Sequence, residues 1–195
     1  MRWLNLAGIV PCTEVEGPGR RFALWVQGCR LQCPGCCNPE MFAFEPRQLA
    51  TVESVVRRIA SSQEHFRIEG VTFLGGEPVL QAQSLAEVAA ACQARGLSVM
   101  VFTGYTIEQL HREPLPGVAE LLAATDVLVD GPYFAGEADH VRNWAGSSNQ
   151  RFHFLTECYA AGIERDPRWA DGVEFAIDAM GKLTRSGWPD LPQQG

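Results

Sequence analysis

Residues 28–40 read GCRLQCPGCCNPE, and four cysteines fall within the nine positions from Cys29 to Cys37. Thiols this close together are typical of three kinds of chemistry: a zinc site, a pair of disulfides or an iron–sulfur cluster. The spacing of the ligands, and the positions of the other cysteines in the chain, distinguish between these possibilities.

Disulfides and zinc are the weaker interpretations. The chain has seven cysteines, an odd number, and we expect a cytoplasmic protein, in which thiols stay reduced. A structural zinc site normally takes a second ligand pair some distance away, but Cys12, Cys92 and Cys158 are isolated and the four histidines are not paired. All four zinc ligands would then come from one loop, in which the adjacent Cys36 and Cys37 point in divergent directions and strain the site.

An iron–sulfur cluster fits the spacing better. Cys29, Cys33 and Cys36 form a C-x3-C-x2-C pattern, which can wrap three corners of a four-iron cluster. Three thiolates leave one iron open to a substrate, just as a catalytic zinc site keeps an open position. Cys37 is then a small packing residue beside the cluster, and Gly35 lets the loop turn tightly. If Cys37 were a fourth ligand, the protein would instead be an iron–sulfur electron carrier.

Strand-like and helix-like runs alternate along the chain, which predicts βαβ units and a parallel sheet. Thr51 is expected to cap a helix, and Ser84 with Glu87 and Thr106 with Gln109 read as capping boxes. A further helix is expected near residues 117–124. The expected strands are 21–27, 70–76, 97–104, 126–131 and 151–155.

These elements predict an α/β fold, either a doubly wound sheet or a partial barrel. Of the two we expect a partial, open TIM-like (β/α)6 barrel with parallel strands and a C-terminal hairpin extension. We expect a single domain over residues 1–195, with a core of about residues 9–156. Residues 157–195 form an extension whose role the sequence leaves open. Residues 173–187 within it are typical of a hairpin, for which closing the open side of the barrel and binding a partner are the two alternatives.

Several candidate residues follow the expected strands directly. Cys29, the Gly75–Gly76 pair, Thr103 and Asp130 each lie just beyond the carboxyl end of a strand. In parallel α/β architectures ligands bind at this edge of the sheet. We therefore expect these residues to converge on one site although they are far apart in sequence.

The chain resembles the radical S-adenosylmethionine (radical SAM) superfamily in two motifs. The cysteine loop after a first strand is one, and the GGEP segment after the next strand is the other. The resemblance implies a [4Fe–4S] cluster whose open iron holds S-adenosylmethionine (SAM), with reductive cleavage to methionine and a 5′-deoxyadenosyl radical. Glu77 is equally typical of a carboxylate that organises its own loop. The implied metal ligands are Cys29, Cys33 and Cys36. The candidate cofactor-binding residues are Gly35, Cys37, Asn38, Gly75, Gly76, Glu77, Pro78, Thr103 and Asp130; among these, Thr103 and Asp130 are equally typical of residues that simply cap their strands.

Three further stretches resemble one family of glycyl-radical activases, the activating proteins of anaerobic ribonucleoside-triphosphate reductase. They are EGPGRRFALWVQGC, CPGCCNPE and the block at 127–155 that contains GSSNQR. The resemblance implies a glycyl-radical enzyme as protein substrate and a reductant such as flavodoxin or ferredoxin. Residues 146–151 are candidates for holding SAM or the partner's loop, or alternatively form a polar loop that caps the last strand. Radical modification of a peptide or small molecule is the alternative activity.

The overall composition restricts the partners. Hydrophobic residues make up 46% and charged residues 20% of the chain, as in ordinary globular proteins. The 16 basic and 23 acidic residues give a net charge of −7, which argues against nucleic-acid binding. No stretch is apolar enough to cross a membrane, and the apolar run in MRWLNLAGIVPC is too short for a signal peptide. We therefore expect no membrane partner.

Overall fold

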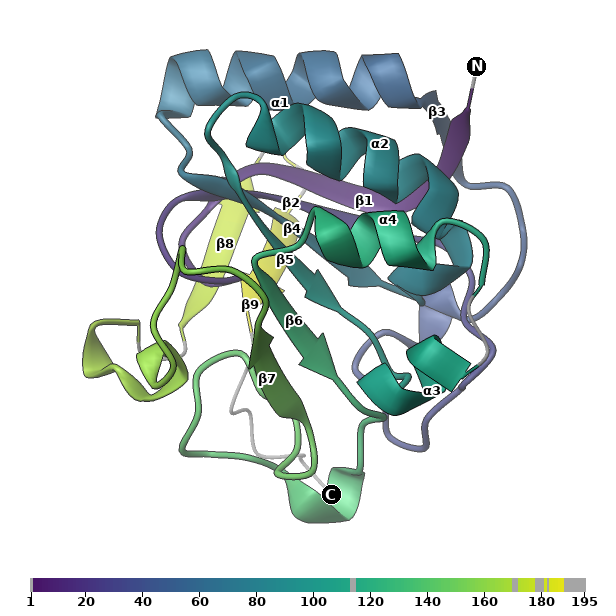
Figure 1. The fold of residues 1–195 in the computed structure, drawn as a ribbon, viewed down its shortest axis with the longest axis vertical. Coiled ribbons are helices and arrows are strands. Elements are labelled where there is room, and N and C mark those ends of the chain that lie inside the picture. The colour runs from purple at the N-terminus through teal and green to yellow at the C-terminus, as the bar shows by residue number, and fades with distance from the viewer. Residues whose placement is uncertain (1, 113–114, 170–171, 178–180, 182, 188–195) are drawn as a thin grey trace.

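The computed structural model describes residues 2–112, 115–169, 172–177, 181 and 183–187. Its architecture is shown in Figure 1. The strands are β1 (Trp3–Thr13), β2 (Arg21–Val26), β3 (Gln48–Thr51), β4 (Gly70–Gly75), β5 (Ser98–Phe102), β6 (Val127–Asp130), β7 (Arg151–Phe154), β8 (Val173–Ile177) and β9 (Leu183–Gly187). The α-helices are α1 (Val52–Phe66), α2 (Ala82–Gln93), α3 (Ile107–Arg112) and α4 (Val118–Ala123), and short 3-10 turns cover Pro39–Met41, Pro78–Gln81, Ala135–Glu137, Ile163–Arg165 and Pro167–Trp169.

One open sheet organises the fold. Its strand order is β3-β1-β2-β4-β5-β6-β7. Strands β2, β4, β5 and β6 are mutually parallel, whereas β1, β3 and β7 pair antiparallel with their neighbours. The predicted α/β fold with an open, mostly parallel sheet and a C-terminal hairpin is confirmed. The parallel run contains four strands, because the expected fifth, β7, folds back against β6.

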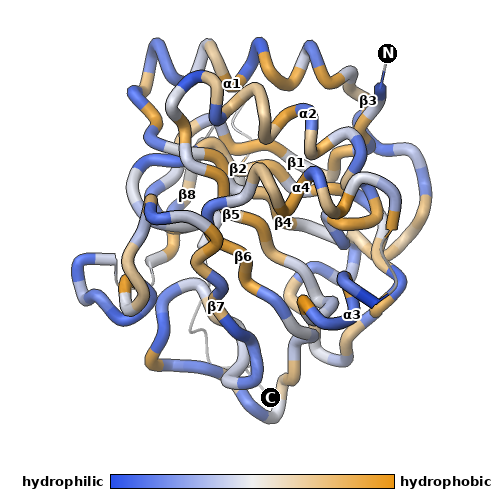
Figure 2. Tube along the Cα trace, viewed as in Figure 1, coloured by the Kyte–Doolittle hydropathy of each residue, from blue (hydrophilic) through white to orange (hydrophobic). Residues whose placement is uncertain are grey.

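The two faces of the sheet have different roles, which follow from the alternation of side chains along each strand. Phe22, Leu24 and Val26 of β2 point to the face that α1, α2 and α4 cover, and they join the main hydrophobic core there. Trp25 points to the opposite face, where it lines a cavity. Figure 2 shows the central strands as predominantly hydrophobic, whereas α1 is hydrophilic along its outer side.

The helix caps agree with the sequence in two places out of three. The Thr51 hydroxyl accepts the amide of Ser54, so the predicted cap of α1 is confirmed. Thr106 and Gln109 bond to each other's backbone amides, as a capping box requires. The predicted box at Ser84 is wrong because α2 already begins at Ala82, and the Ser84 hydroxyl instead donates to the carbonyl of Trp3.

Strand β1 was not expected from the sequence. It lies antiparallel to β2, with Leu6 opposite Val26 and Ile9 opposite Leu24, and buries Leu4 and Leu6 in the core. At its far end Thr13 leads into the loop on which the β8–β9 hairpin rests. Within the described part of the chain, no helix combines the length and apolarity needed to cross a membrane.

Candidate functional site

A cavity of about 400 Å³ lies on the sheet face opposite the helices and reaches the carboxyl ends of the parallel strands. Its walls come from the cysteine loop, from the segments that follow β4, β5 and β6, and from the open sheet face. This is the edge at which parallel α/β folds bind ligands. Among the predicted residues, those that line it are Cys29, Cys33, Cys36, Cys37, Asn38, Gly75, Gly76, Glu77, Pro78 and Thr103.

The cysteine loop is held at the end of β2 by backbone bonds. The amide of Gly28 donates to the carbonyl of Met41 at 2.9 Å, and that of Cys29 to the carbonyl of Phe42 at 3.1 Å. Gly28 has φ of +100°, and a side chain there would press on the Phe44 ring. Glycine is thus required where the loop leaves the strand.

Gly35 turns the far side of the same loop. Its φ is +78°, and a Cβ there would lie 2.9 Å from the side chain of Ala135. The amide of Cys36 donates to the carbonyl of Cys33 at 3.1 Å, which closes the turn between these two cysteines. Gly35 therefore shapes the loop, and it does not itself line the cavity.

The thiols of the loop differ in their acidity. A hydrogen bond with the Cys37 side chain lowers the pKa of Cys36 to about 6, whereas the pKa of Cys37 is raised by the same bond and by burial. Burial raises the pKa of Cys29, although the amides of Gln32 and Leu31 oppose this. The pair therefore favours one thiolate that accepts a hydrogen bond from the other, protonated thiol. Such a thiolate is the form that ligates metal.

The Gly75–Gly76 pair brings the end of β4 against the cysteine loop. The amide of Gly76 donates to the carbonyl of Val26 at 2.8 Å, and that of Glu77 to the carbonyl of Gly28 at 2.9 Å. A Cβ on Gly76 would collide with the Gly28 carbonyl and lie 2.9 Å from the Met41 carbonyl. Only glycine permits this contact between the two motifs.

Glu77 is buried, with 1% of its surface exposed, and serves as an organising carboxylate. It accepts the Thr103 hydroxyl at 2.8 Å, the Gly104 amide at 2.8 Å and the Val79 amide at 3.1 Å. Burial raises its pKa to about 7, against the opposing effect of these three donors. Glu77 thereby ties the ends of β4 and β5 together beside the cavity, and Thr103 acts through this bond.

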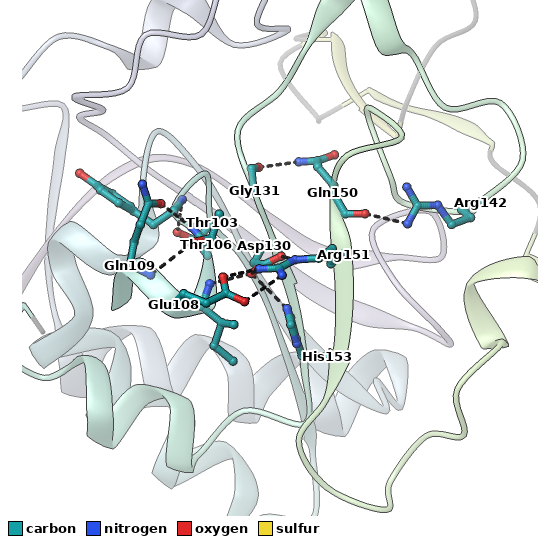
Figure 3. Close-up of polar contacts among 12 residues, drawn as sticks. Thr103, Thr106, Glu108, Gln109, Asp130, Gly131, Arg142, Gln150, Arg151 and His153 are labelled. Atoms are coloured by element: carbon teal, nitrogen blue, oxygen red, sulfur yellow. Dashed lines mark hydrogen bonds and ion pairs between the residues drawn. The ribbon is translucent and has the colours of Figure 1, made fainter. Parts of the chain in front are cut away.

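The Asp130 side chain does not line the cavity, and Figure 3 shows it among Arg151, His153 and Glu108. Asp130 has the same parity in β6 as Leu128, which packs in the helix-side core, so its side chain points away from the cavity face. Its Oδ2 accepts the Ile107 amide at 2.6 Å and pairs with Arg151 Nη2 at 2.6 Å. His153 Nε2 lies 3.0 Å from the same oxygen without hydrogen-bond geometry. The next residue, Gly131, lines the cavity instead.

Only some of residues 146–151 line the cavity. Gly146 and Gln150 line the cavity, and the Gln150 side chain accepts the Gly146 amide at 2.8 Å and donates to the Gly131 carbonyl at 3.2 Å. Arg142 holds this segment by donating to the carbonyl of Gln150 at 2.7 Å (Figure 3). Arg151 does not line the cavity, and it forms ion pairs with Asp130 and with Glu108.

Sequence reasoning missed the floor and one side of the cavity. Trp25, Leu74 and Phe102 form an apolar floor, and the period-two pattern of the strands could have identified them. Ser186 and Gly187 of the C-terminal hairpin also line the cavity, although no local signal in the sequence links them to it.

The residues present fit an iron–sulfur cluster better than a single metal ion. No group of three or more His, Cys, Asp or Glu side chains among the described residues gathers tightly enough to hold one ion. Cys29, Cys33 and Cys36 nevertheless line one cavity, together with Cys37, as cysteines that share a cluster must. The glycine contact at Gly76 and the apolar floor leave space beside them for a nucleoside-sized ligand.

The match to a family model agrees with an iron–sulfur cluster site. Residues 15–153 match the family model described as "4Fe-4S single cluster domain". The anaerobic ribonucleoside-triphosphate reductase-activating protein of Salmonella typhimurium is 33% identical over 151 residues, which are 74% of this chain and 95% of that protein. The protein of the same description from Enterobacteria phage T4 is 32% identical over 158 residues, 79% of this chain and 96% of that one. Among solved structures, QueE from Escherichia coli matches with a TM-score of 0.44 and 17% identity over 53% of each chain.

Proposed function

The chain belongs to the radical SAM family of single-cluster 4Fe-4S proteins, together with the reductase-activating proteins, and we propose that it generates a glycyl radical on a partner enzyme. The partner is a glycyl-radical enzyme of the anaerobic ribonucleotide reductase type. The observation that carries the proposal is the convergence of three loop thiols and the glycine pair at the end of β4 on one cavity. We expect the reaction to take place in the cytoplasm, where an exposed cluster and free thiols persist.

Each part of the cavity has a distinct task in this proposal. Cys29, Cys33 and Cys36 would hold three irons of the cluster, and Cys37 would stay outside the ligand set. The segment at 75–78 offers backbone groups to the amino group of SAM, because its Gly–Gly contact leaves no side chain in the way. The apolar floor below excludes water from the reacting centre.

When bound, a cluster held by Cys29, Cys33 and Cys36 would supply one electron, received from a reductant such as a flavodoxin or ferredoxin, to the sulfonium of SAM. The products would be methionine and a 5′-deoxyadenosyl radical, which would take a hydrogen atom from a glycine Cα of the partner, leave as 5′-deoxyadenosine and transfer the unpaired electron to the glycine. The chain itself contributes orientation and a shielded space for this transfer.

The test combines two products in one anaerobic experiment. The reconstituted chain receives reductant, SAM and an anaerobic ribonucleotide reductase, and 5′-deoxyadenosine is measured by mass spectrometry while the glycyl radical is measured by electron paramagnetic resonance. We expect both products from the wild type, neither from Cys36→Ala, and both from Cys158→Ala, which removes an exposed cysteine away from the loop.

Other outcomes point to the alternative functions. Formation of 5′-deoxyadenosine without a glycyl radical on the reductase would indicate a radical SAM enzyme with a peptide or small-molecule substrate. A complete cluster that yields no 5′-deoxyadenosine would indicate an electron carrier.

A further inference from the structure

The β8–β9 hairpin lies beyond residue 153, where the family match ends, and returns to the opposite end of the chain. It packs on the loop between β1 and β2. The Thr13 hydroxyl donates to Glu174 at 2.6 Å, and the amide of Glu14 donates to the same carboxylate at 2.9 Å. The Glu174 carboxylate thus accepts one hydrogen bond from a side chain and one from a backbone amide where β1 leads into that loop.

A second bond fixes the other strand of the hairpin. The amide of Gly187 in β9 donates to Glu16 at 2.6 Å. Gly187 has φ of +89°, and a Cβ there would collide with the Gly172 carbonyl and lie 2.9 Å from the Val15 side chain. The strand is therefore seated without room for a side chain at this position.

The pairing register of β8 and β9 shows which side chains share each face of the hairpin, and the two faces have different surroundings. Glu174 and Ser186 lie directly opposite each other, so their side chains share a face. This face turns inward, because Glu174 bonds Thr13 and Ser186 is buried against the cavity. Val173 and Phe175 have the other parity and are exposed.

The inward face completes the cavity. Ser186 and Gly187 line it together with Val15 and Glu16, while the cysteine loop lines another part of its wall. The main sheet is open, with β3 and β7 at its edges, and so does not close this space by itself. A carbon-centred radical reacts with any accessible C–H or S–H donor, which makes an enclosing wall functionally important.

We propose that the β8–β9 hairpin is a wall of the reaction cavity that excludes small hydrogen-atom donors, and that Thr13, Glu16 and Glu174 are the positioning residues that hold it. The proposal rests on the SAM cleavage of the proposed function. It gives the chain a specificity element of its own, because the matched family segment ends before the hairpin.

The test weakens the wall without removing it. Glu174→Ala deletes the carboxylate that grips Thr13 and Glu14, and Glu174→Gln keeps one acceptor oxygen. Glu157→Ala is the control, since Glu157 is an exposed glutamate of the same extension. In the metal-free full chain, hydrogen exchange at the β8–β9 amides should become about tenfold faster in Glu174→Ala, change less in Glu174→Gln and stay unchanged in the control.

The second readout measures access to the cavity and needs no partner enzyme. The reconstituted chain cleaves SAM under reductant in the presence of perdeuterated glycerol. When a donor enters, a glycerol C–D bond breaks, a C–D bond forms at the 5′ carbon, and the unpaired electron stays on glycerol. We expect the fraction of 5′-deoxyadenosine that carries one deuterium to rise severalfold in Glu174→Ala compared with the wild type and the control.

Two outcomes would contradict the proposal that the β8–β9 hairpin is a wall of the cavity. Faster exchange with an unchanged deuterated fraction would show that the hairpin does not limit access, and unchanged exchange would show that Glu174 does not hold it. If Glu174→Ala fails to fold, the partial loosening in Glu174→Gln decides by the same two readouts. Absence of 5′-deoxyadenosine from the wild type would instead count against the proposed function, and would leave the exchange result as a separate test of the anchor.

Discussion

The Glu77 carboxylate accepts a hydrogen bond of 2.8 Å from the Thr103 hydroxyl, and this bond joins the ends of β4 and β5. Burial raises the pKa of Glu77 from 4.5 to about 7. The unfolded chain therefore loses this proton near the lower value, whereas the folded chain keeps it until about pH 7. The folded state binds more protons between these limits, so the contribution of Glu77 to stability is full at low pH and falls as the pH rises.

Glu77→Gln should remove this part of the pH dependence. As the pH rises from the pKa of Glu77 in the unfolded chain to that in the folded chain, the free energy of unfolding of the wild type should fall by an amount on the order of 3 kcal/mol. Urea unfolding of the metal-free chain at about pH 5 and about pH 8 measures the change. We expect a smaller fall in Glu77→Gln than in the wild type or in Glu157→Gln, an exposed control. Equal falls in all three proteins would show that Glu77 does not titrate in this range.

The strand ends were predictable from the sequence because buried strands carry a clear local pattern. The segment RFALWVQ and the glycines at 75 and 76 mark two strands and their carboxyl ends, which β2 and β4 confirm. Asp130 shows the limit of this reasoning. Its position at a strand end was correct, but the parity it shares with Leu128 directs its side chain away from the cavity.

Other features depend on contacts between distant parts of the chain. Arg21 opens a strand, yet it is fully buried and donates to Thr72 and Ser98, far away in sequence. The hydrogen bond between Thr13 and Glu174 joins residues that are 161 positions apart in the sequence. Nothing local to either residue encodes such a pairing, so neither the burial of Arg21 nor the contacts that anchor the hairpin could be predicted, although closure of the open side was one of the two roles expected for the hairpin.

The cysteine loop makes a prediction about which thiol is dispensable. Cys29, Cys33 and Cys36 complete the C-x3-C-x2-C pattern without Cys37, which forms a hydrogen bond with Cys36. Cys37→Ala should therefore retain the iron and sulfide of the reconstituted cluster, whereas Cys36→Ala should lose a large share of both. Iron and acid-labile sulfide are measured after anaerobic reconstitution, with Cys158→Ala as the control. Loss of the cluster from Cys37→Ala would make Cys37 a ligand and favour the electron carrier.

The close contact between the cysteine loop and the Gly75–Gly76 segment predicts that a methyl group added at Gly76 destabilises the fold. A Cβ on Gly76 collides with the carbonyl of Gly28, which itself accepts the Glu77 amide. Gly76→Ala should lower the free energy of unfolding of the metal-free chain by about 1–3 kcal/mol, as overpacking does. Gly136→Ala is the matched control, because a Cβ there meets nothing within 4 Å. Similar unfolding midpoints in urea for the two variants would contradict the close contact.

The ion pair between Asp130 and Arg151 should stabilise the fold without serving the cavity. Asp130 is fully buried, and Arg151 donates to both its oxygens at 3.0 and 2.6 Å. Arg151→Ala leaves that carboxylate with the Ile107 amide and, at pair distance, His153. We expect a loss of about 2–3 kcal/mol in unfolding free energy, less than for a pair buried on both sides because Arg151 is partly exposed.

Arg112→Ala is the control for this change, since Arg112 is exposed at the end of α3. Urea unfolding of the metal-free proteins measures the loss, and anaerobic assays of the reconstituted proteins measure 5′-deoxyadenosine. Because Asp130 and Arg151 lie outside the cavity lining, the KM for SAM should stay within about twofold in Arg151→Ala at a temperature where it remains folded. A large rise in this KM with unchanged stability would place Asp130 in SAM binding after all, as its position at the end of β6 first suggested.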